Sequence, residues 1–343
     1  MILVCGNFGG ASQTSSGQII KTINLYQALV ERFGADFVLK FNTSKGIVSL
    51  FKLVFLLPYY LSICKNVVIL PAHNGIRIIV PLLKCANLYF RRRIHYVVIG
   101  GWLPDFLSKK PLLTKQLRAI SGIYVETISM KEKLNAMRFN NVFIVPNFKQ
   151  LQVLNESDIM VNYSSNYRFC TFSRVMKEKG IEDAIAAVMQ LNEKYDDKNF
   201  FLDIYGNIEE NQEEWFDNLQ ENFPDYILYK GGVPSNQSVN VLKNYFALLF
   251  PTYYEGEGLA GTLLDAMAAG LPVICSDWKY NKEIVKDYST GLLFHTHDVE
   301  DLKLKMEYLC SHPDEYKSMR MAALRESEKF TPTQALSELF CRL

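Results

Sequence analysis

Short apolar runs rich in β-branched residues alternate with segments of helical periodicity along the first half of the chain. The runs that predict strands lie at residues 2–5, 37–41, 67–70, 95–99, 122–125 and 142–145. Helical patterns fall between them, for example at 17–33, 76–90 and 130–138. This alternation predicts a parallel β-sheet built from βαβ units.

A polar, weakly patterned stretch at 151–166 interrupts the alternation and is typical of an interdomain linker. The alternation then restarts, with predicted strands at 168–172, 200–205, 226–229, 247–250, 272–275 and 291–294 and helices at 181–195, 213–223, 238–245 and 262–268. We therefore expect an α/β chain of two Rossmann-like domains that face each other across a cleft. Ligands of such sheets bind beyond the carboxyl ends of the strands.

The most apolar stretch, at residues 47–64, approaches the length of a membrane-spanning helix. Lys52 and Pro58 interrupt it, so we favour a buried helix or one that lies at an interface. Residues 1–6 have no basic segment before their apolar positions, which predicts a first strand rather than a signal peptide. The seven scattered cysteines lack metal-ligand spacing, which favours free thiols in a reducing cytosol.

Composition excludes a disordered, collagen-like or coiled-coil chain, since 49% of the residues are apolar and 21% are charged. The formal charge of +1 hides a strong asymmetry. Residues 1–150 carry 19 Lys/Arg against 5 Asp/Glu, whereas residues 151–343 carry 18 against 31. We expect the basic half to meet an anionic partner. No nucleic-acid-binding module accompanies it, so nucleic acid is not an expected partner.

Two loops have features of anion-binding sites. The loop at 6–17 is rich in Gly and in small hydroxyl residues, which lets backbone N–H groups approach an anion. A flexible connection explains this loop equally well. The loop at 173–180, SRVMKEKG, places Arg174 and Lys179 after a predicted strand. This cation pair suits a diphosphate, although a solvated helix cap is the simpler interpretation of the loop by itself.

The segment at 251–272, PTYYEGEGLAGTLLDAMAAGLP, carries the most information. Three glycines precede a helix that we predict to begin near Thr262, with Glu257 in the loop and Asp265 in the first turn of the helix. Thr262-x-x-Asp265 also fits a capping-box variant, and Glu257 could be a solvated turn residue. Neither alternative explains why so many glycines and carboxylates surround one loop. Carboxylates that hold sugar or ribose hydroxyls, beside amides that hold phosphate, do explain it.

This segment, with its Glu257-x7-Asp265 spacing, resembles the E-x7-E region of family 4 retaining glycosyltransferases, in particular the type that acts in biosynthesis of bacterial capsule, exopolysaccharide or lipopolysaccharide. Three further segments resemble that family in the same order: IVPN at 144–147, SRVMKEKG at 173–180 and NKEIVKDYSTGLLF at 281–294. The resemblance implies the GT-B fold. It implies an acceptor-binding domain at 1–160, a donor-binding domain at 161–330, and a C-terminal helix at 331–343 that crosses back to the first domain.

The resemblance also implies roles for single residues. Arg174 and Lys179 would hold the diphosphate of a nucleotide-sugar donor, and Glu257 would contact the hydroxyls of the donor sugar near the reaction centre. Asp265, shorter than the usual Glu, would bind the ribose. Backbone amides would receive phosphate or sugar oxygens at Gly258, Leu259, Ala260, Gly261 and Thr262, and from the other domain at Gly9 and Gly10. No covalent nucleophile is expected, because the acceptor would attack on the face that the leaving phosphate vacates.

The chain departs from the family in the loop after the fourth strand, where many relatives carry a His and this chain has GGWLPD at 100–105. His73 and Asp105 are the candidates for the acceptor side instead. The chain has no D-x-D motif. With the Arg174 and Lys179 pair, this predicts no cofactor and no essential metal, the nucleotide sugar being a co-substrate.

The basic residues of the first half lie beside apolar helical segments, at Lys84, Arg91, Arg92, Arg93, Lys109, Lys110 and Lys115. That combination predicts peripheral docking on an anionic membrane surface, on the cytoplasmic side, and a saccharide acceptor carried on a lipid. A soluble domain whose positive field only guides anionic substrates is the alternative. Rival functions are a nucleotide-sugar epimerase of the same fold, a phosphorylase or synthase acting on free sugars, and a catalytically silent membrane-associated partner subunit.

Overall fold

The computed structural model describes residues 1–10, 17–155, 157, 166–195 and 199–343. The chain divides into two compact units, which we treat separately. Unit 1 comprises Met1–Gln150 and Phe330–Leu343, and unit 2 comprises Leu151–Lys329. The predicted boundary between 160 and 161, and most of the predicted linker, fall on residues outside the described part of the chain.

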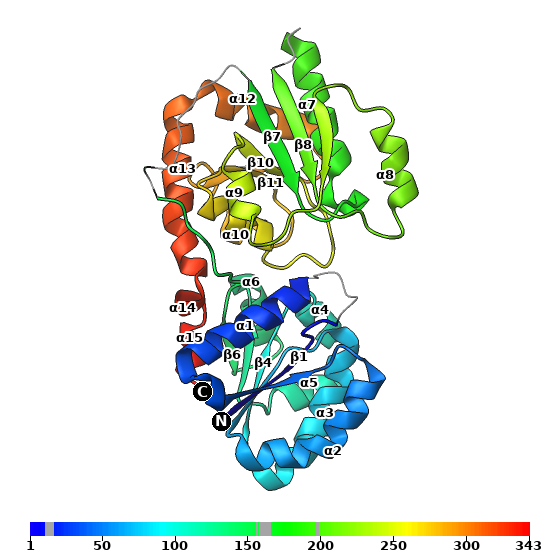
Figure 1. The fold of residues 1–343 in the computed structure, drawn as a ribbon, viewed down its shortest axis with the longest axis vertical. Coiled ribbons are helices and arrows are strands. Elements are labelled where there is room, and N and C mark those ends of the chain that lie inside the picture. The colour runs from blue at the N-terminus through cyan, green and yellow to red at the C-terminus, as the bar shows by residue number, and fades with distance from the viewer. Residues whose placement is uncertain (11–16, 156, 158–165, 196–198) are drawn as a thin grey trace. The chain divides into compact units, whose positions relative to one another are not determined.

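Unit 1 is built around a sheet of six parallel strands in the order β2-β1-β3-β4-β5-β6 (Figure 1). The strands are β1 (Ile2–Gly6), β2 (Val38–Asn42), β3 (Asn66–Ile69), β4 (Arg93–Val97), β5 (Gly122–Val125) and β6 (Val142–Ile144). Its helices are α1 (Gly17–Phe33), α2 (Ile47–Ile63), α3 (His73–Phe90), α4 (Leu103–Ser108), α5 (Pro111–Leu117), α6 (Ile128–Ala136), α14 (Pro332–Ala335) and α15 (Ser337–Phe340).

Unit 2 contains a second sheet of six parallel strands, in the order β12-β11-β10-β7-β8-β9. The strands are β7 (Tyr167–Phe172), β8 (Phe200–Tyr205), β9 (Ile227–Gly231), β10 (Ala247–Phe250), β11 (Val273–Ser276) and β12 (Gly291–Phe294). Its helices are α7 (Ile181–Tyr195), α8 (Glu213–Gln220), α9 (Ser238–Leu242), α10 (Gly261–Ala268), α11 (Asn281–Ile284), α12 (Val299–Ser311) and α13 (Pro313–Ser327).

The predicted α/β alternation is confirmed, with strand ends that differ by no more than two residues from those expected. The strands read as near-continuous apolar runs because helices cover both faces of a parallel sheet. β3, for example, is buried along its whole length. Helix ends follow capping chemistry where a suitable side chain is present. Thr127 caps α6 by accepting a hydrogen bond from the Met130 N–H, and Asp298 caps α12 in the same way through Asp301.

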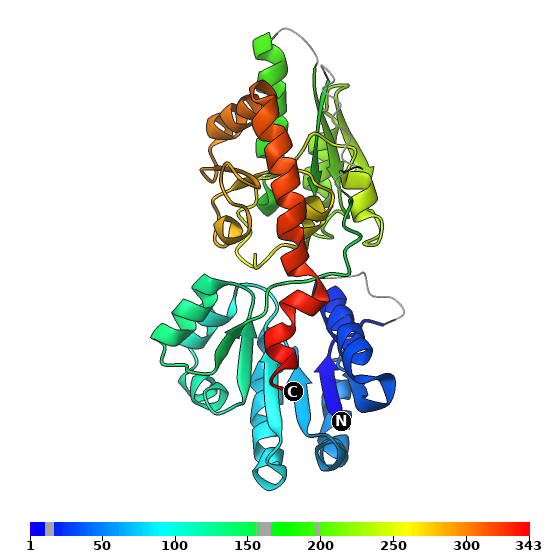
Figure 2. The ribbon, with the colours of Figure 1, turned by 90° about the vertical axis from the view of Figure 1, so that its left-hand side faces the viewer.

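The C-terminal segment completes the core of unit 1. Ala335, Leu336 and Leu339 are at most 4% exposed and belong to the same apolar cluster as Ile2 and Val4 of β1. Figure 2 shows α14 and α15 lying along this unit, which also holds both chain termini. The last 14 residues are therefore a structural part of unit 1, although unit 2 precedes them in the sequence.

The apolar stretch that sequence alone left between a buried and an interfacial helix forms α2. One stripe of α2 is buried, formed by Ser49, Leu53, Leu57 and Leu61, while most of its other residues are exposed. No helix in the described part of the chain combines the length and the hydropathy that a membrane span requires.

Candidate functional site

The candidate donor site lies at the carboxyl ends of two neighbouring strands of unit 2. β7 and β10 pair in parallel, so the loops that follow them, 173–180 and 251–260, start from one edge of the sheet. From this pair the chain builds the sheet outward in opposite directions, through β8 and β9 on one side and β11 and β12 on the other. Such a switch in strand order is where α/β sheets bind ligands.

The two loops also contact each other through their backbones. The Tyr253 N–H donates to the Glu178 carbonyl at 2.8 Å. Gly180 has a φ of +69°, and a Cβ added there would lie 2.1 Å from the carbonyl oxygen of Pro251. Only glycine fits this left-handed position against the neighbouring backbone. The glycine that ends the SRVMKEKG segment therefore sets how closely the two loops approach.

Lys179 and Glu257, predicted as donor ligands, form a buried ion pair. The Lys179 ammonium donates to Glu257 Oε2 at 2.5 Å, and the Thr252 hydroxyl donates to the same oxygen at 3.0 Å. The two charged residues are only 9% and 8% exposed. Removing water from two charges is costly, so an ion pair in this position needs close geometry and additional hydrogen bonds, which Thr252 provides.

Arg174, the third predicted residue, lies near Lys179, because both side chains approach the same aromatic ring. The Arg174 guanidinium carbon is 5.9 Å and the Lys179 ammonium 5.0 Å from the centre of the Tyr254 ring. Arg174 is half exposed and pairs with Glu209 at 2.6 Å. Sequence reasoning missed Tyr254, although its place directly before Glu255 and Glu257 in YYEGEG was a usable signal. The structure thus places two cations within 6 Å of the centre of one aromatic ring.

The start of α10 differs from the prediction by one residue, and this changes the interpretation of its cap. Ala260 is the N-cap, with no side-chain hydrogen bond to the helix, and the helix begins at Gly261. The capping-box alternative with Thr262 at the N-cap is therefore wrong. Within the described residues, the buried Thr262 hydroxyl oxygen has no hydrogen-bond partner. The residues predicted to receive donor oxygens, Gly258, Leu259, Ala260, Gly261 and Thr262, thus lead into a helix N-terminus without a side-chain cap, which favours anions.

Asp265 is the fifth residue of α10, and the prediction that it lies in the first turn is wrong. It is 3% exposed, so its carboxylate is enclosed by protein. The error follows from the helix start, because the glycine-rich loop passes into helical conformation before Thr262. The role of Asp265 toward a ribose stays a prediction.

In unit 1, the loops that follow β1, β2 and β3 surround a cavity of about 430 Å³. Asn7, Thr43 and His73 line it together with Ile47 of α2 and Ile78 of α3. β1 and β3 are adjacent and the chain leaves them in opposite directions, so this cavity also lies at a switch in strand order. Unit 1 therefore has a ligand-sized space of its own at the edge where α/β proteins bind ligands.

His73 begins α3, and its ring stacks on Trp102 at 3.8 Å and meets the edge of Phe106 at 5.5 Å. Partial burial lowers the pKa of His73, which favours the neutral imidazole. Asp105 is exposed on α4 and is not among the residues that line the cavity. Of the two acceptor-side candidates, the structure brings only His73 to the cavity.

The glycine loop of unit 1 is described up to residue 10, and the rest of the predicted loop, 11–16, lies outside the described residues. The Gly9 N–H donates to Asn7 Oδ1 at 2.9 Å, and Gly9 has a φ of +79°. The roles predicted for Gly9 and Gly10 toward a donor stay predictions.

Residues 155–326, half of the chain, match the family described as "Glycosyl transferases group 1". The chain belongs to this glycosyltransferase family. The match covers both loops at the carboxyl ends of β7 and β10, and so includes Arg174, Lys179 and Glu257.

Known glycosyltransferases resemble the chain in sequence and in fold. The GtfA subunit of the UDP-N-acetylglucosamine–peptide N-acetylglucosaminyltransferase of Streptococcus pneumoniae is 32% identical over 164 residues, which are 46% of this chain and 31% of that protein. O-antigen chain mannosyltransferase B of Escherichia coli is 35% identical over 75 residues, 22% of this chain and 19% of the relative. The chain spans about a third of the length of the first two curated relatives that it matches.

Among solved structures, Anabaena HepE in complex with UDP superposes with a TM-score of 0.76 at 14% identity, covering all of both chains. HepE has also been solved with UDP-glucose. At this identity the likeness establishes the fold, and the two parallel six-stranded sheets of the glycosyltransferase are those of GT-B proteins.

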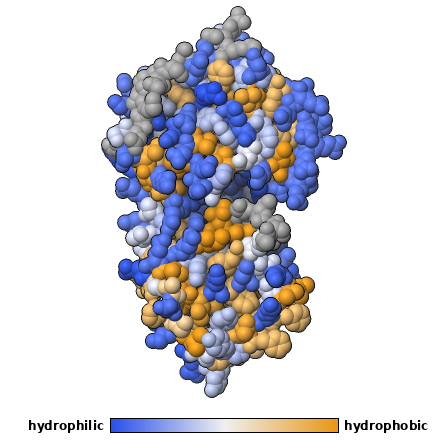
Figure 3. Space-filling model, in the orientation of Figure 1, coloured by the Kyte–Doolittle hydropathy of each residue, from blue (hydrophilic) through white to orange (hydrophobic). Residues whose placement is uncertain are grey.

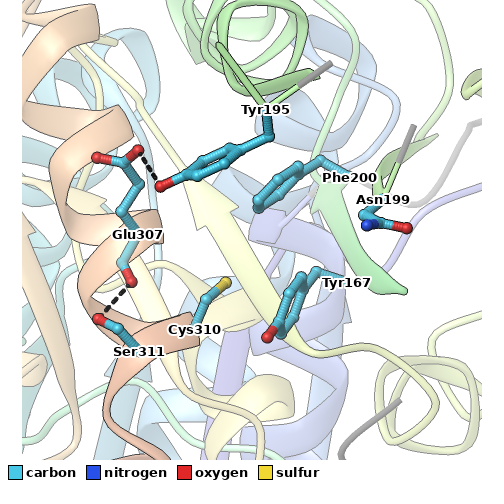
Figure 4. A pocket seen from close by; sticks show the side chains of 7 residues that line it. All are labelled: Tyr167, Tyr195, Asn199, Phe200, Glu307, Cys310 and Ser311. Carbon is cyan, nitrogen blue, oxygen red and sulfur yellow. Dashed lines mark hydrogen bonds between the residues drawn. The ribbon is translucent and has the colours of Figure 1, made fainter. Parts of the chain in front are cut away.

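Unit 2 has a further cavity, of about 360 Å³, that sequence reasoning did not find (Figure 4). It lies where β7 and β8 begin, at the sheet edge opposite to the candidate donor site. Tyr167 and Tyr195 both stack on Phe200, and Glu307 accepts a hydrogen bond from the Tyr195 hydroxyl at 2.9 Å. Within the described ranges, no group of three or more His, Cys, Asp or Glu side chains is arranged to hold a metal ion.

Proposed function

We propose that this glycosyltransferase moves a sugar, with retention of its anomeric configuration, from a nucleotide-diphosphate sugar to a saccharide acceptor. The observation that carries the proposal is the buried Lys179–Glu257 pair, with Arg174 beside it, at the carboxyl ends of β7 and β10. The position is that of a ligand site in an α/β sheet, and it holds cations for phosphate beside a carboxylate for sugar hydroxyls.

Binding of the donor would replace two ion pairs between side chains of the site. Its diphosphate would take Arg174 from Glu209 and Lys179 from Glu257, and the planar guanidinium would contact two phosphate oxygens at once. Glu257 would then accept hydrogen bonds from hydroxyls of the donor sugar. Amides at the start of α10 and the Thr262 hydroxyl would receive the remaining oxygens, and Asp265 would bind the ribose.

The reaction requires no protein nucleophile. The bond between the anomeric carbon and the diphosphate oxygen breaks, a bond to the acceptor oxygen forms on the same face, and the leaving phosphate takes the acceptor's proton. Arg174 and Lys179 would stabilise the charge that develops on the leaving diphosphate. We propose that these cations act in place of a metal, and the absence of a D-x-D motif from the sequence supports this.

The acceptor side belongs to unit 1 in this proposal, with His73 at the cavity beyond β1 and β3. We propose an acceptor saccharide carried on a lipid, a peripheral position on the cytoplasmic face of an anionic membrane, and a role in cell-surface polysaccharide biosynthesis of the family 4 type. The net positive charge of residues 1–150 and the likeness to an O-antigen mannosyltransferase support these points. The HepE complexes make UDP the first nucleotide to test.

The test has two steps on the same purified chain. UDP, GDP and ADP are first screened for a rise in melting temperature, because a ligand that binds only the folded state stabilises it. The matching nucleotide sugars are then assayed for release of nucleoside diphosphate, with and without EDTA. We expect one nucleotide to stabilise the chain and its sugar to turn over without added metal. Recovery of an epimerised nucleotide sugar, or dependence on inorganic phosphate, would contradict sugar transfer to a saccharide.

The site assignment has a matched set of variants. Lys179→Ala and Glu257→Ala should lower donor turnover at least 100-fold, whereas Lys177→Ala and Glu255→Ala, exposed residues of the same two loops, should retain it. Circular dichroism checks that each variant is folded. Full turnover in folded Lys179→Ala or Glu257→Ala would reject the assignment.

A further inference from the structure

The outward surface of α2 carries an unusual density of exposed apolar side chains. Phe51 is 66% exposed, Phe55 80% and Tyr59 60%. On α3, which packs beside α2, Leu88 and Tyr89 are 77% and 86% exposed. We call this surface the docking face and define it by the exposed apolar residues of the two helices: Ile47, Val48, Phe51, Val54, Phe55, Leu56, Tyr59, Ile78, Leu88 and Tyr89.

Folding alone does not require these side chains to be apolar. The inner stripe of α2 already packs unit 1 through Leu53, Leu57 and Leu61, each at most 1% exposed. A surface helix ordinarily has polar residues opposite such a stripe. Figure 3 shows apolar colours gathered on the part of unit 1 where Figure 1 draws α2 and α3. A contiguous exposed patch of this kind marks a surface that a membrane or another molecule covers.

The charges around the docking face indicate which kind of partner covers it. Between Asp36 and Glu126 the sequence contains thirteen Lys or Arg residues and a single acidic residue, Asp105. Lys45, just before α2, and Lys52, on α2, are exposed, and so is Arg77 on α3. An anionic bilayer matches both features. Apolar side chains would enter the boundary between its head groups and acyl chains, while cations would contact its lipid phosphates. Each cation near such a surface contributes about 1 kcal/mol, which falls with rising salt.

The docking face also borders the cavity of unit 1. Ile47 and Ile78 are 72% and 50% exposed, and both line the cavity that contains His73. A head group that leaves a bilayer along these two side chains would reach His73 while its lipid tail stays in the membrane. The connection is local, because Ile47, the first residue of α2, and His73, the first residue of α3, line the same cavity.

We propose that the docking face binds an anionic bilayer and that the cavity of unit 1 receives the head group of a lipid-anchored acceptor directly from it. The docking step deepens the membrane position proposed above and is argued from the surface of unit 1, whereas the transfer of the head group also rests on the proposed sugar transfer. The two steps can therefore fail separately.

Docking is tested by sedimentation with sucrose-loaded vesicles of phosphatidylcholine, with or without 25% phosphatidylglycerol, at low and high salt. The chain should bind the anionic vesicles at low salt and release them at high salt. Phe51→Ser/Phe55→Ser should lower the partition coefficient at least tenfold, and Lys45→Glu/Lys52→Glu should do so for anionic vesicles only. Leu304→Ser and Lys317→Glu, exposed residues of unit 2, are the matched controls and should bind like the parent chain.

Equal binding to neutral and anionic vesicles, or unchanged binding of the Phe51→Ser/Phe55→Ser variant, would overturn the docking proposal. A dimer that this variant dissociates, without vesicle binding by the parent, would assign the face to a second copy of the chain instead. Donor turnover in solution is measured on every variant. Variants of the docking face should retain it, so a loss of turnover and a loss of docking report on different proposals.

The position of the cavity is tested by fluorescence. Ile47→Trp places an indole where the docking face meets the cavity, and Leu304→Trp places one on unit 2. Vesicles that contain brominated phosphatidylcholine should quench the added emission of Ile47→Trp and leave that of Leu304→Trp unchanged. Absence of quenching at Ile47→Trp in a chain that binds the vesicles would show that this border lies away from the lipid.

Discussion

Lys179 and Glu257 neutralise each other inside unit 2, at 9% and 8% exposure. A charged residue in such a position depends on its partner, because loss of one member leaves the other buried and unpaired. The same dependence suits a site where an incoming diphosphate takes over one member of the pair. We therefore expect stability and donor binding to be linked at this single contact.

A double-mutant cycle measures that link. We expect Lys179→Met and Glu257→Gln each to lower the free energy of unfolding by about 3–5 kcal/mol, the cost of stranding a buried charge. The double variant should be destabilised by less than the sum of the two, since it strands neither charge. Urea unfolding gives all four values. Additive losses would mean that the two side chains do not interact.

A second residue-scale feature is the buried histidine of β4. His95 Nδ1 lies 2.9 Å from the Tyr124 hydroxyl and Nε2 lies 3.3 Å from Asn66 Oδ1. Burial, and then the charges of Arg93 and Arg342, lowers the pKa of His95 from 6.5 to about 4. The folded chain thus holds a neutral imidazole at a pH where the unfolded chain is protonated.

The lowered pKa of His95 makes the folding stability depend on pH. Below pH 6.5 the unfolded state binds a proton that the folded state does not, so stability falls as the pH drops toward 4. We expect His95 to contribute a loss of about 2 kcal/mol between pH 7 and pH 5. His95→Gln should reduce this loss of unfolding free energy at low pH, as measured by urea unfolding. His295→Gln should make it steeper, because Asp301 raises the pKa of His295 and gives the opposite sign.

At the scale of elements, the alternation of strands and helices was predictable, and most contacts within the site were not. Parallel strands covered on both faces leave continuous apolar runs in the sequence, so β5, β8, β10 and β12 have the predicted ends. The pairing of Lys179 with Glu257 joins residues 78 positions apart, which no local pattern encodes. The approach of Arg174 and Lys179 to the Tyr254 ring also joins distant parts of the sequence.

α2 shows a different limit of sequence reasoning. Its residues are apolar on nearly every side, so periodicity could not tell the packed stripe from the outward one. The three arginines that follow α3 were predicted to meet a membrane as a group. Arg92 instead donates from Nε to the Leu61 carbonyl at 2.7 Å and so satisfies the C-terminal end of α2. Arg91 and Arg93 are exposed, so their contact with lipid phosphates stays a prediction.

The contact between the loops after β7 and β10 gives a prediction about Gly180. Gly180→Ala would place its Cβ 2.1 Å from the Pro251 carbonyl oxygen at a φ of +69°. Gly231→Ala is a matched control, because it has a φ of +74° and nothing within 4 Å of the added Cβ. We expect Gly231→Ala to cost about 1–2 kcal/mol in unfolding free energy and Gly180→Ala clearly more. Donor turnover should fall only in Gly180→Ala; equal effects of the two would mean that the loops do not constrain each other.

At the scale of the whole molecule, the chain crosses between its units twice, after Gln150 and after Lys329. The second crossing makes the stability of unit 1 depend on the last residues of the sequence. Leu336 and Leu339 are fully buried in the core of unit 1.

We expect Leu336→Ala and Leu339→Ala each to destabilise unit 1 by about 2–5 kcal/mol, and Leu112→Ala, at a residue 79% exposed on α5, to have almost no effect. Limited proteolysis with mass spectrometry locates the change. Early cleavage should appear within residues 1–150, while the protection of residues 166–329 by a bound nucleotide should persist. Early cleavage confined to unit 2 would contradict the assignment of the C-terminal segment to unit 1.

The return of the C-terminal segment also orders events on the ribosome. Unit 2 is continuous in the sequence and can close as soon as it has emerged. Residues 1–150 must wait for Phe330–Leu343, which are made 179 residues later. At the usual 5–20 residues per second this delay is about 10–40 s. During that time the nascent chain displays an unfinished core together with the apolar surface of α2, so we expect its folding during synthesis to benefit from a chaperone that covers these surfaces.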